Sequence, residues 1–92
     1  MAVLVNKLIL SRIKDSLSCC TGHSLASYIC VSEPDMIGAF VVVKRDHDRH
    51  PYAAYWFNAI KPGFMEGAYY AAEDQAVADI QKRAEFPRVA AA

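Results

Sequence analysis

The sequence has no excess of charge of either sign and no long apolar run. Ten Lys and Arg side chains balance ten Asp and Glu side chains over 92 residues. Without a net field to attract polyphosphate, nucleic acid is not expected as the main partner. Asn6 and Lys7 interrupt the first apolar stretch, and Arg12 and Lys14 interrupt the next. Neither a membrane span nor a secretion signal fits this pattern, which predicts a cytoplasmic protein.

Cysteines are few and odd in number. Cys19, Cys20 and Cys30, in a chain predicted to stay in the cytoplasm, indicate reduced thiols rather than a disulfide framework. Together with His23 they offer soft metal ligands, but no Cys-x2-Cys pair is present, and adjacent residues at a helix end point about 100° apart. We therefore expect packing in the core or at a helix end here, and no metal ion.

Sequence motifs of nucleotide-binding and hydrolytic enzymes are also missing. The four glycines are scattered, and none lies in a phosphate-binding loop between a strand and a helix. The chain has no Gly-x-Ser-x-Gly segment, and no cysteine and histidine are spaced so as to predict contact. These absences favour a protein without a cofactor that binds a partner, rather than an enzyme.

The composition is that of a folded domain, because 54% of the residues are hydrophobic and only 22% are charged. We expect one domain over residues 1–87 and a flexible tail over residues 88–92. A chain of 92 residues is expected to be too short for three packed layers.

The N-terminal segment has helical periodicity. Val5, Ile9, Ile13 and Leu17 recur every four residues, which predicts an amphipathic helix from about residue 4 to residue 20. Gly22 follows and is suited to the left-handed backbone that ends a helix.

The middle of the chain predicts three strands. Residues 25–31, 36–45 and 52–60 are rich in β-branched and aromatic side chains, and turn-forming residues separate them. The second run is apolar on both alternating faces and is expected to be the central strand. The second and third runs are expected to form a hairpin around the polar loop 46–51.

The last third is less regular. Residues 64–72 are either another extended piece or the first turns of a long helix, and periodicity does not separate these alternatives. From Glu73 an apolar stripe predicts a helix that ends at Phe86-Pro87. The predicted fold is therefore α+β: an N-terminal helix, a three-stranded antiparallel meander and a C-terminal helix, with both helices on one face of the sheet.

That arrangement leaves the second sheet face, which carries aromatic residues, for a partner. Tyrosine, tryptophan and arginine are enriched where protein surfaces bind one another. The predicted partner-binding residues are Arg45, His47, Arg49, His50, Tyr52, Tyr55, Trp56 and Phe57. The alternative is that half of the aromatic residues are core and the rest are scattered, exposed side chains.

The leading functional hypothesis is a non-enzymatic protein-binding module that covers the surface of a host or cognate protein. Small domains without motifs are frequent among phage and mobile-element proteins, which suggests an inhibitor of a host defence enzyme. A homodimer built through the second sheet face is an alternative. Two others use the loop: weak nucleic-acid binding through Lys44, Arg45 and Arg49, or a small metal-dependent enzyme at His47 and His50.

Overall fold

The computed structural model describes residues 2–19 and 21–91, with side chains for residues 5–19 and 21–85. Two helices flank four consecutive strands. These are α1 (Ala2–Ser18), β1 (Ser24–Glu33), β2 (Met36–Lys44), β3 (Tyr52–Asn58), β4 (Gly63–Tyr70) and α2 (Glu73–Ala91). The strands form one antiparallel sheet in the order β1-β2-β3-β4. The α+β class, the two helices, the three predicted strands and the hairpin around residues 46–51 are confirmed.

A fourth strand, β4, corrects the predicted three-stranded sheet and decides the open assignment of residues 64–72. It pairs antiparallel with β3, from Tyr52 opposite Tyr70 to Asn58 opposite Gly63. Because β4 lies at the edge of the sheet and most of its side chains are exposed or half-buried, its sequence shows no strong alternation. Pairing with β3 therefore determines its conformation, rather than local propensity.

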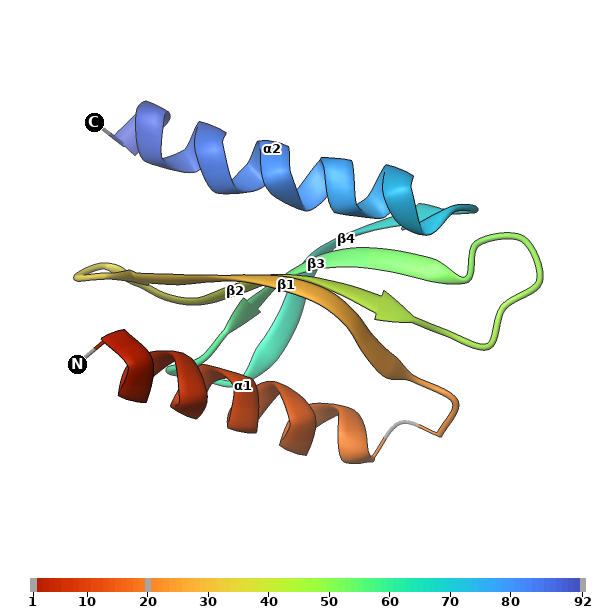
Figure 1. Cartoon of the computed structure of the whole chain (residues 1–92), viewed down its shortest axis with the longest axis horizontal. Coiled ribbons are helices and arrows are strands. Elements are labelled where there is room, and N and C mark those ends of the chain that lie inside the picture. Colours follow the sequence, from red (N-terminus) through yellow and green to blue (C-terminus); the bar gives the residue numbers. More distant parts are fainter. Residues whose placement is uncertain (1, 20, 92) are drawn as a thin grey trace.

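The two helices cover opposite faces of the sheet, so the prediction of both on one face is wrong (Figure 1). The molecule has three layers in spite of its length. Alternate residues of β2 separate the two cores: Val41 packs with Ile13 of α1, whereas Val42 packs with Ile80 of α2. One helix is enough to cover each face of so small a sheet, which explains why β2 is apolar on both sides. We call these surfaces the α1 face and the α2 face.

The C-terminal helix is longer than predicted. It continues to Ala91, past Phe86-Pro87, so α2 includes residues 88–91. Proline inside a helix removes one backbone hydrogen bond and usually kinks or ends the helix, which is why the local sequence predicted a stop at Pro87. Ala92, the end of the predicted tail, lies outside the described residues, and the predicted mobility of residues 88–92 stays a prediction.

Candidate functional site

The aromatic residues predicted to bind a partner belong largely to the two cores. Phe57 is fully buried on the α1 face, where its side chain is out of reach of a partner of the folded chain. Tyr52 and Trp56 pack beneath α2, and Tyr55 packs against the α1 core. The premise of an open aromatic sheet face therefore fails, because the face that was expected to be free is covered by the second helix.

One part of the aromatic set stays accessible on the α1 face, near the start of β3 and the end of β4. The Arg45 guanidinium carbon lies 4.4 Å from the centre of the Tyr69 ring. The ring of Tyr55 meets that of Tyr69 at 86°, with 6.3 Å between their centres. Tyr69 as a whole residue is 50% exposed. We call Arg45, Tyr55 and Tyr69 the Arg45–Tyr69 cluster.

A glycine in β4 makes room for this cluster. A Cβ atom added to Gly67 would lie 2.7 Å from Cε1 of Tyr55 and 3.0 Å from the hydroxyl of Tyr69. Tyr55 therefore packs directly on the backbone of Gly67, as aromatic side chains often do across a sheet from glycine. The sequence analysis missed both Gly67 and Tyr69 as site residues, because only the pairing of β4 with β3 brings them next to Tyr55.

Arg45 is held in place by the loop that follows β2. Its backbone N–H donates to the carbonyl of Pro51 over 2.6 Å, and Nη2 donates to the carbonyl of His50 over 2.9 Å. Burial raises the pKa of the Tyr55 hydroxyl, and its hydrogen bond with Tyr69 raises that pKa further, while Arg45 acts in the opposite direction. The phenol of Tyr55 is thus kept neutral as part of a fixed polar and aromatic surface.

The loop itself is exposed and carries mixed charge. Its fold depends on His47, whose Nδ1 accepts hydrogen bonds from the backbone N–H groups of Arg49, over 3.3 Å, and His50, over 3.0 Å. That nitrogen cannot bind a metal ion without breaking both bonds, which weakens the metal-dependent alternative. Asp46 and Asp48 offset much of the positive charge nearby.

The predicted group of cysteines and histidine does not converge in the described part of the chain. Cys19 lies at the end of α1, where its thiol contacts the carbonyl of Ser16, whereas Cys30 lies within β1 and packs against the α1 core. Burial raises the pKa of the Cys30 thiol. Within residues 2–19 and 21–91 no group of three His, Cys, Asp or Glu residues could hold a metal ion. Cys20 lies outside the described residues.

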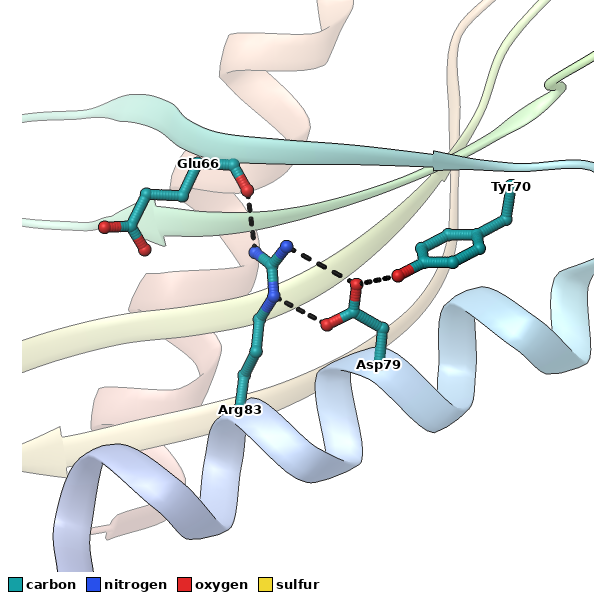
Figure 2. A network of polar contacts seen from close by, with 4 residues as sticks. All are labelled: Glu66, Tyr70, Asp79 and Arg83. Atoms are coloured by element: carbon teal, nitrogen blue, oxygen red, sulfur yellow. Dashed lines mark hydrogen bonds and ion pairs between the residues drawn. The ribbon is translucent and has the colours of Figure 1, made fainter. Parts of the chain in front are cut away.

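A second polar cluster ties α2 to the edge of the sheet (Figure 2). Asp79 accepts hydrogen bonds from the hydroxyl of Tyr70 and, over 2.7 Å, from Nε of Arg83. Arg83 also donates to the carbonyl of Glu66 over 2.8 Å. The side chains of Asp79 and Arg83 are only 14% and 21% exposed. This network joins two points of β4 to successive turns of α2, so we interpret it as structural.

The network predicts a loss of stability in alkaline solution. The hydrogen bond to Asp79, more than burial, raises the pKa of Tyr70 above its ordinary value of 10.0. The folded chain therefore holds this proton more tightly than the unfolded chain does. Its stabilising contribution is complete below the unfolded pKa and disappears as the pH rises through the folded pKa.

We expect the free energy of unfolding to decline above about pH 10, and to decline less steeply in Tyr70→Phe and Asp79→Ala. Urea unfolding at a series of pH values measures both slopes. Glu85→Ala, at an exposed acid of the same helix, is the control and should keep the wild-type slope. Equal slopes in all four proteins would show that Tyr70 is not bound to Asp79.

No helix in the described part of the chain is both long enough and apolar enough to cross a bilayer. The chain matches no protein-family model, no curated protein and no solved structure.

Proposed function

We propose that this chain is a protein-binding module, and that it binds its partner through the Arg45–Tyr69 cluster and the adjoining loop 46–51. The observation that carries the proposal is the geometry of Tyr69, a half-exposed residue whose ring is held between Arg45 and Tyr55. An aromatic ring that is already fixed in place loses little conformational entropy on binding. Tyrosine and arginine are also the residues that most often dominate binding energy.

The charges around the cluster suggest the chemistry of the partner. Lys44, Arg45 and Arg49 provide three cations at this end of the sheet, against the carboxylates of Asp46 and Asp48. The small excess of positive charge favours a partner surface on which acidic side chains surround an apolar patch. An excess this small gives weak attraction to a polyphosphate, which leaves nucleic acid as the second choice.

The narrower form of the proposal is that the partner is a host enzyme and the chain its inhibitor, encoded by a phage or another mobile element. Its support is the general character of small, motif-free domains rather than any single residue. This narrower proposal also places the protein in the cytoplasm.

The test uses a matched pair of β4 variants. Tyr69→Ser removes the exposed ring of the cluster, and Met65→Ser removes a side chain of the same strand that is 44% exposed and lies opposite Trp56, on the α2 face. Affinity capture from host lysate, with quantitative mass spectrometry, compares both with the wild type. We expect one protein to be retained in stoichiometric amount by the wild type and Met65→Ser, and at least tenfold less by Tyr69→Ser.

Two outcomes would contradict this proposal. Equal retention by all three proteins would place the binding surface elsewhere. Capture of nucleic acid that disappears after nuclease treatment, with affinity that declines steeply as salt increases, would favour the nucleic-acid alternative.

A further inference from the structure

The two edge strands of the sheet differ in how well they are protected against pairing with another strand. In β4, Glu66 has a left-handed backbone with φ of 56°, next to an irregularity in the pairing with β3. Its carbonyl accepts a hydrogen bond from Arg83 of α2. Bulges and covering side chains are the usual means by which proteins block an edge strand. The β4 edge is therefore interrupted at Glu66, which hinders pairing with a further strand.

The hydrogen bonds of β2 determine which groups of β1 face outward. The Ala59 N–H donates to the carbonyl of Ile37 over 3.0 Å, and the Arg45 N–H to the carbonyl of Pro51 over 2.6 Å. The odd-numbered residues of β2 therefore direct their backbone groups toward β3. In an antiparallel sheet the backbone groups alternate in direction along the strand, so the even-numbered residues of β2 point toward β1.

The register of β1 with β2 then identifies the outward-facing residues. Ile29 lies opposite Phe40 and therefore bonds to β2. It follows that Tyr28, Cys30 and Ser32 direct both N–H and C=O away from the sheet. Among the described residues no side chain or loop is recorded as bonding to these groups. In Figure 1 the helices lie above and below the sheet and leave this edge uncovered.

We propose that a second copy of this chain pairs with β1 in antiparallel fashion, in a two-fold dimer centred on Cys30. In this register Tyr28 of one copy lies opposite Ser32 of the other, and the two Cys30 residues face each other. The N–H and C=O of each outward residue then form hydrogen bonds with the C=O and N–H of the residue opposite in the other copy. The regular part of β1 begins at Ser27, after the irregularity between Leu25 and Ser27, so it contains all three residues.

The charge pattern favours a second copy as the occupant of this edge. Residues 24–32 contain no charged side chain, so no like charges meet across the axis when two copies of this stretch pair with each other. The first charge is at Glu33, which in this register lies opposite Ser27 of the other copy rather than opposite Glu33. A charged foreign strand would find no complementary charge along this edge.

The helices leave room for such pairing. Strands lie about 4.8 Å apart, so a helix above the β1–β2 pair would be about 5 Å from the two-fold axis. The two copies of α1 would then pack about 10 Å apart, which is a normal separation for contacting helices. Arg12 reaches the carbonyl of Ala59 at the far side of α1. The opposite flank of α1, where Leu10 lies next to Lys7, Lys14 and Asp15, would meet its symmetry mate.

The proposal is tested first on the purified wild-type chain under reducing conditions. We expect a mass twice the 10.2 kDa of the chain in analytical ultracentrifugation, with dissociation on dilution. Residue-resolved hydrogen exchange should show protected amides at Tyr28, Cys30 and Ser32 at high concentration and loss of that protection on dilution. The amides of Ile29 and Val31, bonded to β2, should stay protected throughout. A monomeric mass at high concentration, or rapid exchange at the three outward amides, would overturn the proposal.

Two variants at the centre of β1 distinguish the contribution of the backbone N–H to dimerisation from that of the thiol. Cys30→Pro removes the central outward N–H, a position at which an edge strand tolerates proline, and should weaken dimerisation at least tenfold. Cys30→Ser keeps the N–H and should remain dimeric. If circular dichroism shows that Cys30→Pro does not fold, the hydrogen exchange of the wild-type chain at high and low concentration still tests the dimer.

The control Tyr69→Ser should also remain dimeric, because its surface lies at the other edge of the sheet, so the outcome here is independent of the proposed function. Protection of the outward amides only after a foreign protein is added would mean that a different chain occupies this edge, and self-pairing would be rejected.

Discussion

Gly38→Ala is expected to lower the free energy of unfolding by about 3 kcal/mol, the upper end of the range for an overpacked core. An added Cβ atom would overlap the carbonyl oxygen of Phe57 and would lie 2.9 Å from two ring carbons of Trp56. The first contact is with backbone, which cannot rotate away, so β2 and β3 would have to separate. Urea unfolding followed by circular dichroism measures the change in midpoint.

Gly63→Ala is the matched control for this substitution. It adds the same methyl group in the same sheet, but the nearest atom outside its chain neighbours, the carbonyl oxygen of Lys61, would be 3.8 Å away. That is an ordinary contact, and we expect a change within about 0.5 kcal/mol. Similar losses at both positions would mean that the carbonyl oxygen of Phe57 does not lie directly against Gly38.

Phe57→Ala is expected to cost about 3 to 5 kcal/mol, because it leaves a large cavity in the α1 core. The side chain of Phe57 is fully buried between strands and helix, and its ring lies 5.0 Å from that of Phe64. Tyr69→Ala removes an aromatic side chain of similar size from the surface and should cost about 1 kcal/mol or less. Urea unfolding of both variants provides the comparison.

The same two variants also show which of the two aromatic residues belongs to the core and which belongs to the proposed binding surface. A Phe57→Ala protein with unchanged stability and no partner binding would return Phe57 to the binding surface, as the sequence alone suggested. Tyr69→Ala is expected instead to stay folded and to fail to retain the partner.

Local sequence was enough to predict α1, the turn after it, the central strand and the hairpin loop. The four-residue spacing of Ile9, Ile13 and Leu17 specifies α1, because a helix with one apolar stripe has one way to face a core. Gly22, with φ of 81°, lies in the turn after α1, as its position predicted. The apolar run of β2 likewise specifies a central strand, and the polar loop after it specifies a hairpin.

Other features depended on contacts between residues distant in the chain. Residues 63–70 have no clear period of their own and become a strand through pairing with β3. The side on which each helix packs is also a tertiary property, since an amphipathic helix fits either face of a sheet that is apolar on both. That β2 is apolar on both faces was visible in the sequence, but the position of α2 decides that Val41 and Val42 belong to different cores.

The candidate site divides in the same way. The sequence by itself singled out Arg45, Tyr55 and the loop histidines, because charged and aromatic side chains at a hairpin are a local pattern. Only the tertiary structure buried Phe57, brought Tyr69 beside Arg45 and left the outward groups of β1 without a partner among the described residues. The physical reason is that local propensity determines backbone conformation, whereas burial and strand pairing depend on which other segments arrive at each face and edge.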